Sequence, residues 1–217
     1  ERSLSAACAF LLEGQTVVED CVEDGVEDGA WHQRRQEDGV RARAREDGAW
    51  HDFMTEPGEA GAWTTAYVGR CLLYLPVSLR TQRFVAALER AAARLRAQAS
   101  PLDGWGYNHR CPPDADSTAH AILFLHACGL DVPIAAYRRL LSFQRADGGF
   151  ATYRAAITDS PDAASDGWMH SHPCVTPVAL HALLTVLSLD DPRIARGLEA
   201  VRTGQRVDLE GLWPSYW

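Results

Sequence analysis

The chain has 217 residues, of which 47% are hydrophobic, so it can bury the core of one ordinary domain. Its formal net charge is -8 and no cluster of basic residues is visible, which argues against a nucleic-acid partner. All 21 basic residues are arginine, which excludes a lysine Schiff base and the lysine of a phosphate-binding loop.

The cysteine pattern indicates a reducing compartment. Six cysteines are widely spaced without a C-x-x-C pair, and the sequence shows no secretory signal pattern. We therefore expect reduced thiols in a cytoplasmic protein. Since no apolar stretch is long enough to cross a bilayer, we also expect no transmembrane segment.

Helical periodicity dominates the chain, and no segment shows the alternation of a convincing β-strand. Pro133 and Pro192 suit first helical turns, Asp116 is expected to cap the helix that follows it, and Gly129 is expected to end that helix. Several helices are apolar nearly all round, which indicates packing in concentric layers. The expected helices span residues 4–12, 64–75, 82–98, 117–128, 133–144, 176–187 and 192–203.

A turn pattern recurs four times along the chain: a glutamine, a spacer, Asp-Gly or Gly, and an aromatic residue. In each copy Asp and Gly suit the turn backbone, and the aromatic can stack on the adjacent repeat. The helices after the first three turns carry Trp63, Asp116 and Cys174 at equivalent positions in their first turns. The aromatic residues of the four turns are Trp50, Trp105, Phe150 and Trp213.

These turns and helix starts resemble the tryptophan-and-glutamine repeats of squalene-hopene cyclases, oxidosqualene cyclases and class II diterpene cyclases. Protein prenyltransferase β-subunits belong to the same superfamily, and the resemblance covers most of residues 4–217. It implies an all-α fold, an α/α barrel (toroid) of helical hairpin repeats whose inner helices begin at one mouth. Trp63, Asp116 and Cys174 would then surround one cavity. The repeats argue for the fold, and function must be argued from the site.

The expected domain organisation is a single α/α-barrel domain over residues 1–217 with an acidic inserted loop at residues 15–52. This loop contains an imperfect duplication, Glu-Asp-Gly-Val at 23 and 37 and Glu-Asp-Gly-Ala-Trp-His at 27 and 46. Its composition favours a solvated insertion over a metal-binding or substrate-covering loop. Because a last turn at 211–217 has no helix after it, we expect an incomplete barrel, one closed with fewer helices, or one completed by oligomerisation or a second barrel domain or subunit.

The segment 114–119, Asp-Ala-Asp-Ser-Thr-Ala, resembles the Asp-x-Asp-Asp-Thr-Ala motif with which class II cyclases protonate an alkene or epoxide. The resemblance implies that Asp116 is the proton donor. Such an acid must be neutral, and burial and the neighbouring Asp114 raise its pKa while the helix N-terminus lowers it. Ser117 replaces an aspartate, as in the Asp-Cys-Thr-Ala motif of oxidosqualene cyclases. The structural alternative is that Asp116 only caps its helix and Asp114 is a turn residue.

Spacing suggests which residues accompany the acid. His120 lies one helical turn after Asp116, and His172 precedes the next inner helix, so either could hydrogen-bond the acid and return its proton. Aromatic faces that stabilise carbocations are expected near the inner-helix starts. The predicted catalytic residues are thus Asp116, Asp114, His172 and His120, and the predicted substrate-binding residues are Trp63, Trp105, Trp168, Tyr67 and Ser117.

No metal site is predicted. Cys111, Asp114, Asp116, His172 and Cys174 could converge, but their spacing fits no compact zinc pattern. The absence of an Asp-Asp-x-x-Asp sequence gives no support to metal-triggered diphosphate ionisation. We expect no cofactor, with Mg²⁺ entering only if the substrate carries a diphosphate.

The sequence therefore favours an enzyme, an isomerase of the class II terpene cyclase type that protonates a hydrophobic isoprenoid-like small molecule and guides its cyclisation. Two alternatives stay open. The same barrel could catalyse a different cyclisation with Asp116 only orienting the substrate, or it could be a non-catalytic barrel that binds an isoprenoid or a partner protein.

Overall fold

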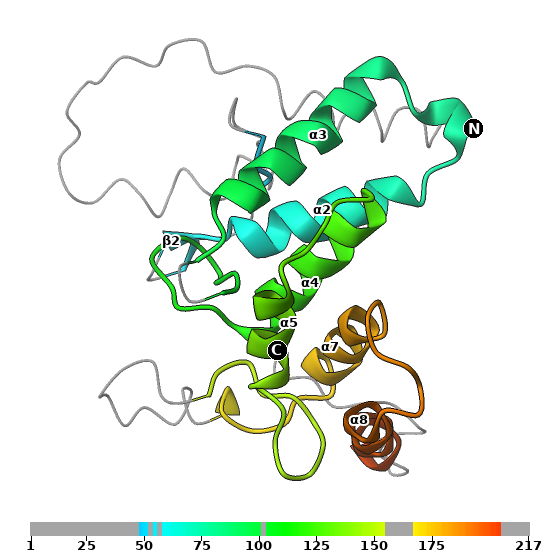
Figure 1. Cartoon of the computed structure of the whole chain (residues 1–217). Helices are drawn as coiled ribbons and strands as arrows, with labels where there is room; N and C mark the ends of the chain where they lie inside the picture. The colour runs from blue at the N-terminus through cyan, green and yellow to red at the C-terminus, as the bar shows by residue number, and fades with distance from the viewer. Residues whose placement is uncertain (1–47, 52–53, 56–57, 101–102, 155–166, 205–217) are drawn as a thin grey trace, which may run out of the picture.

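The computed structural model describes residues 48–51, 54–55, 58–100, 103–154 and 167–204. The predicted helix 4–12, most of the 15–52 insertion and the fourth turn at Trp213 lie outside these residues. The described part is helical, which confirms the predicted all-α fold (Figure 1). Its helices are α2 (Ala62–Leu73), α3 (Gln82–Ala97), α4 (Ala115–Ala127), α5 (Ile134–Leu141), α7 (Val175–Leu183) and α8 (Pro192–Gly204), with a 3₁₀ turn η1 (Val77–Leu79).

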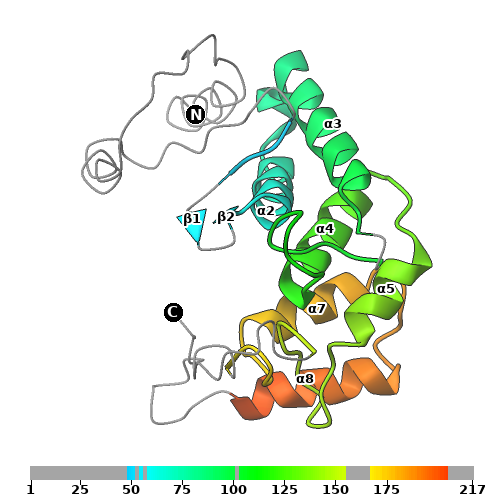
Figure 2. The same cartoon turned by 90° about the vertical axis from the view of Figure 1, so that its left-hand side faces the viewer.

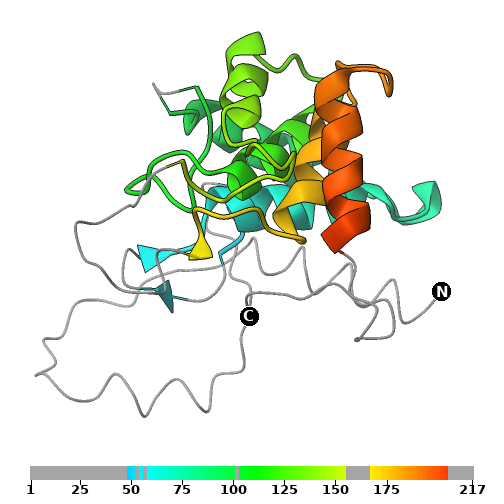
Figure 3. The ribbon, with the colours of Figure 1, turned by 90° about the horizontal axis from the view of Figure 1, so that it is seen from below.

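The helices form two layers. α4 packs between α2 and α7, and these three make the inner row. The outer side of this row is covered by α3, α5 and α8 (Figure 2). Each outer helix follows one inner helix in the chain and runs back along it. Seen from below, α7 lies between α4 and α8 (Figure 3). The result is an arc of three helical hairpins, which matches the predicted alternation of inner and outer helices.

α4 is apolar nearly all round because it is the most central helix of the core. Ten of its residues are buried, because α4 has a helix on each side and outer helices behind it. The outer helices are amphipathic instead, as expected for elements covered on one side only. In α3, for example, Phe84, Leu88 and Leu95 face the core. Burial of such side chains contributes roughly 1.5–3 kcal/mol each.

The three described turns are tied to the inner helices by one repeated contact. The backbone N–H of each turn aromatic donates to a threonine hydroxyl: Trp50 to Thr65 at 3.0 Å, Trp105 to Thr118 at 3.1 Å, and Phe150 to Thr176 at 2.9 Å. Each threonine lies two residues after one of the predicted equivalent positions 63, 116 and 174. The contact therefore places the three helix starts in the same register at one end of the inner row.

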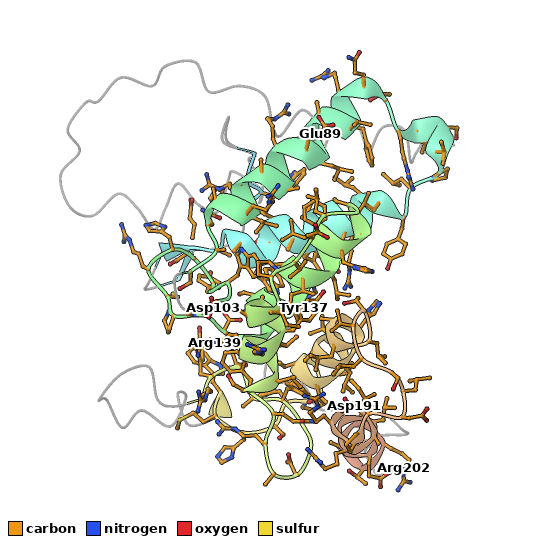
Figure 4. All side chains as sticks on the ribbon, viewed as in Figure 1. Glu89, Asp103, Tyr137, Arg139, Asp191 and Arg202 are labelled. Carbon is orange, nitrogen blue, oxygen red and sulfur yellow. The ribbon has the colours of Figure 1, made fainter. Side chains whose placement is uncertain are left out.

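The turns also pack against the outer helices. Residues 48, 103 and 148 all have a positive φ, of 81°, 65° and 91°, and two of them are glycines. A Cβ on Gly48 would lie 2.7 Å from the Arg90 backbone of α3, and one on Gly148 would meet the Arg196 backbone of α8. Asp103 takes this conformation in the middle turn, near the end of α5 that carries Arg139 (Figure 4).

Several predicted boundaries were wrong. α5 ends at Leu141 and α7 at Leu183, each a few residues before the expected end. Hydroxyl groups explain both ends, because Ser142 Oγ donates to the Arg139 carbonyl and Thr185 Oγ1 donates to the Ala182 carbonyl, each at 2.7 Å. Gly129 does end α4, with a φ of 71°.

The structure also contains two short strands that no alternating pattern in the sequence indicated. β1 (Met54–Thr55) and β2 (Gly58–Glu59) pair as a small antiparallel hairpin before α2. Strands of two residues are too short for an alternating pattern, so periodicity could not have found them.

Candidate active site

Asp116 lies in the first turn of α4, at the end of the inner row where α2 and α7 also begin. Its side chain is 25% exposed. Burial raises the pKa of its carboxyl to about 6 from the ordinary value of 3.8, and a hydrogen bond from the Trp63 side chain works in the opposite direction. A substantial fraction of Asp116 is therefore protonated near pH 6, which is what a proton donor requires.

His120 and Trp63 lie next to the acid, and Tyr67 packs against both of them. His120 Nε2 lies 3.6 Å from Asp116 Oδ1, which is close but too long for a hydrogen bond. Burial, assisted by the charge of Arg70, lowers the pKa of His120 to about 4, so the imidazole is neutral near pH 6. A neutral imidazole adds no positive charge that would favour the ionised form of Asp116.

The aromatic rings form a packed group with the histidine. Trp63 and Tyr67 stack with their centroids 5.7 Å apart, and both meet His120 edge-on at 6.1 and 5.5 Å. Trp63 and Tyr67 are one helical turn apart on α2 and face the same side. The structure therefore brings together four of the predicted site residues from two adjacent helices.

The predicted cap was wrong: Asp114, and not Asp116, caps α4. Asp114 has an extended backbone, and its carboxylate accepts hydrogen bonds from Ser117 N at 2.6 Å and Ser117 Oγ at 2.8 Å. This leaves the carboxyl of Asp116 outside the cap. Burial nevertheless raises the pKa of Asp114 to about 7, partly offset by the backbone hydrogen bond from Ser117 and reinforced by the charge of Asp116.

Asp114 and Ser117 form the buried cap of α4, next to the acid in the chain. Both are 2% exposed, and the Ser117 hydroxyl points at Asp114. This geometry favours a role for Ser117 in the cap over the predicted contact with substrate. Trp105 is also 2% exposed, and its indole N–H donates to the Leu95 carbonyl at 2.7 Å. We therefore interpret Trp105 as a core residue that joins a turn to α3.

The remaining predicted residues lie at the approach to α7. His172 precedes this helix, with its Nδ1 atom 3.9 Å from Cys174 Sγ, and burial lowers its pKa. Trp168 is 39% exposed and meets the ring of Tyr153 at 6.0 Å. These residues precede α7, the third inner helix of the predicted mouth. The group around Asp116, in contrast, comes from α2 and α4.

Sequence reasoning missed Arg70. It lies on α2 one helical turn after Tyr67, and its charge acts on the pKa of both His120 and His181. The spacing of positions 63, 67 and 70 could have placed it on the face of α2 that carries Trp63.

Among residues 48–51, 54–55, 58–100, 103–154 and 167–204, no group of three His, Cys, Asp or Glu side chains is arranged to hold a metal ion. Over the same residues, no helix has the length and apolar character needed to cross a membrane.

The chain resembles solved structures of terpene cyclases. The apo structure of type II terpene cyclase MstE from Scytonema matches with a TM-score of 0.70 and 26% identity, covering 99% of this chain and 54% of that one. A variant of MstE in complex with geranylgeranyl dihydroxybenzoate, its substrate, matches at 0.69 and 25% over 99% and 53% of the two chains. A protein from Actinoplanes matches at 0.63 and 26%, over 79% and 50%.

No protein-family profile and no curated protein matches the sequence. This chain spans about half the length of the MstE structures. The likeness nevertheless covers nearly the whole of this chain and includes structures of the same cyclase with substrate and with product. Together with the paired inner and outer helices, it shows that the chain has a class II terpene cyclase-like fold.

Proposed function

We propose that this chain is a domain of a class II-type terpene cyclase in which Asp116 protonates an alkene or epoxide of a hydrophobic isoprenoid substrate. The observation that carries the proposal is a carboxylic acid whose pKa is raised to about 6, placed at an inner-helix start next to Trp63 and His120. The Tyr67 ring packs against both of these neighbours. The fold and the substrate of MstE support the choice of substrate class.

The Asp116 carboxyl gives its proton to one alkene carbon, the π electrons form the new C–H bond, and the other carbon becomes a carbocation. A neighbouring alkene then attacks this carbocation and closes the ring, and a final proton loss or water addition ends the sequence. The Trp63 and Tyr67 rings stabilise positive charge by their π faces without reacting as the carboxylate would.

His120 is proposed to help return a proton to Asp116 once it has been used. Its Nε2 is 3.6 Å from the acid and the imidazole is neutral near pH 6. His172 is proposed as a second residue near the same mouth, and Asp114 as a positioning residue that holds the helix start. No cofactor takes part in the proposed step, and Mg²⁺ enters only if the substrate carries a diphosphate. A cytoplasmic location and a second barrel domain or subunit remain predictions.

Product analysis of the wild type and Asp116→Asn tests the proposal. Geranylgeranyl dihydroxybenzoate is a suitable first substrate, and incubation in deuterated water marks any proton that enters from the acid. We expect a deuterated cyclic product from the wild type and a loss of at least about 100-fold in Asp116→Asn. Equal product from both proteins would remove Asp116 as the donor. Cyclic product without deuterium would favour the alternative in which Asp116 only orients the substrate.

A further inference from the structure

The last turns of the three inner helices surround a pocket of about 670 Å³. Arg70 comes from α2, His126 from α4 and His181 from α7, and Arg80 enters from the segment after η1. None of the described residues that line the pocket is acidic. The rest of the wall is largely apolar and includes Leu73, Leu123 and Leu184. The pocket is thus both positively charged and partly apolar.

Arg70 has unsatisfied hydrogen-bond donors in this pocket. Its Nε and Nη1 atoms are buried, and neither has a hydrogen-bond partner among the described residues. Buried N–H groups of a guanidinium that lack acceptors cost free energy, which an anion accepting both bonds would recover. The charge of Arg70 also reaches His181, whose pKa is lowered first by burial and then by this arginine.

Arg80 shows what a purely structural arginine does in the same place. Its Nε donates to the Leu75 carbonyl at 3.1 Å and its Nη2 to the Leu73 carbonyl at 2.6 Å. It therefore satisfies carbonyls at the end of α2, the usual role of basic residues near the negative end of a helix. The buried Nε and Nη1 of Arg70 make no such bonds to the described residues, so this role does not account for them.

The pocket and the acid lie along the same helices. Trp63, which donates to Asp116, is followed on α2 by Tyr67 and then by Arg70 at helical spacing. Arg70 lies seven positions after Trp63 on α2, which corresponds to roughly 10 Å at the rise of an α-helix. Both groups act on His120: its Nε2 lies 3.6 Å from Asp116 Oδ1, and the charge of Arg70 lowers its pKa.

The geometry points to an anion-binding site in this pocket, where Arg70 binds the carboxylate or phosphate of an amphiphilic small molecule and the leucines contact the start of its apolar chain. That this molecule is the cyclase substrate rests on the proposed function, but the binding itself does not. The substrate class then narrows to isoprenoid-type chains that carry an anionic group.

Calorimetric titration with dodecanoate, dodecyl phosphate and neutral dodecanol tests the site, because the probes share one chain length and differ in the head group. We expect the wild type to bind at least one anion about 10-fold or more tightly than dodecanol. Arg70→Met should lose that preference. Arg138→Met, at an exposed position of α5, is the matched control and should keep it. The anion that binds more tightly shows whether the natural head group is a carboxylate or a phosphate.

Equal binding of the anions and dodecanol by the wild type would overturn the proposal, and this result needs no variant to fold. An unchanged preference in folded Arg70→Met would also overturn it. The Asp116→Asn variant tests the anion site and the proposed function separately. We expect this variant to lose turnover and to keep the preference for anions. If Asp116→Asn turns over normally while the anions still bind selectively, the proposed function fails and the anion site stands.

Discussion

Two features of Asp116 act on the pKa of its carboxyl in opposite directions. Burial raises the pKa, and the positive N-terminal end of α4 lowers it. Burial is the stronger effect here, since it raises the pKa to about 6 despite the hydrogen bond from Trp63. The structural alternative, in which Asp116 merely caps α4, does not fit the geometry because Asp114 occupies the cap. The Asp116 carboxyl is thus outside the cap and accepts the hydrogen bond from Trp63 of α2.

The activity of the proposed cyclase should depend on pH in a defined direction. Asp116 acts as an acid, so the rate should be highest below pH 6 and fall about tenfold per pH unit above it. The groups that face Asp116 are Trp63, which does not titrate, His120, which is neutral above about pH 4, and Asp114, whose pKa is raised to about 7. Initial rates between pH 5 and 8 would check this; a rate that rises over that range would contradict it.

The raised pKa of Asp116 also predicts a cost in stability. The folded state binds a proton more tightly than the unfolded state, so the contribution of Asp116 to stability falls as the pH rises through about 4 to 6. Asp116→Asn removes this penalty and should raise the free energy of unfolding by about 1–3 kcal/mol at pH 8, with a smaller gain at pH 5. Urea unfolding at both pH values measures it.

The exposed Asp131, just before α5, offers a matched control for this stability measurement. Asp131→Asn should change the free energy of unfolding by less than about 0.5 kcal/mol at either pH. An Asp116→Asn protein that is less stable than the wild type at pH 8 would show that the aspartate makes favourable contacts that outweigh its burial.

Among the elements, α4 depends most on its first turn. Asp114 accepts both bonds from Ser117, and its own N–H donates to the Trp105 carbonyl at 3.0 Å, which ties the cap to the middle turn. Thr118 closes the same unit by bonding to both the N–H and the carbonyl of Trp105. The repeated turn therefore sets the position from which Asp116 projects.

Loss of this cap should destabilise the protein measurably. Asp114→Ala removes the acceptor for the Ser117 N–H and leaves a buried hydroxyl without its partner, so we expect a loss of about 1–3 kcal/mol at pH 5. Because burial raises the pKa of Asp114 to about 7, its contribution to stability falls as the pH rises through about 4 to 7, and the loss should be smaller at pH 8. Asp114→Asn keeps one acceptor oxygen and should lose less. Chemical denaturation of the two variants beside the wild type gives both values; an alanine variant as stable as the wild type would show that the cap is not needed.

For the molecule as a whole, the close approach of α2 to α4 decides whether a site exists. Gly69 makes this approach possible, since a Cβ there would lie 2.6 Å from the ring of Phe124. Trp63 and Tyr67 are on one side of this contact and Asp116 and His120 on the other. Any shift between the two helices therefore separates the acid from its aromatic partners.

Gly69→Ala tests this contact. Alanine is the better helix former by about 1 kcal/mol, but the clash with Phe124 should outweigh this and give a net loss of stability of about 1 kcal/mol or more. Adding Phe124→Leu should relieve the clash, so the double variant should be more stable than the sum of the two single changes predicts. Thermal unfolding of the four proteins completes the cycle, and simple additivity would contradict the close approach.

A second glycine provides the control for backbone effects. A Cβ on Gly167 would meet no atom within 4 Å. Gly167→Ala should therefore leave stability and product formation close to those of the wild type. A similar loss in both alanine variants would point to a general backbone effect and away from the contact between α2 and α4.

By itself, the sequence determined the helices, the turns between them and the equivalence of positions 63, 116 and 174. These features are local, because helical periodicity and turn residues act over a few neighbouring positions. They were enough for the fold class and for the resemblance to class II cyclases. Asp116, His120, Trp63 and Tyr67 could be named for the same reason, since each lies within one or two turns of a helix start.

Only the tertiary structure decided which of these residues meet and what charge state they favour. It assigned the cap to Asp114, buried Trp105 in the core, and set the pKa of Asp116 through the desolvation that α2 and α4 create together. It also gathered Arg70, His126 and His181 around one pocket. Contacts between separate helices depend on how their side chains pack, which no pattern within a single helix encodes.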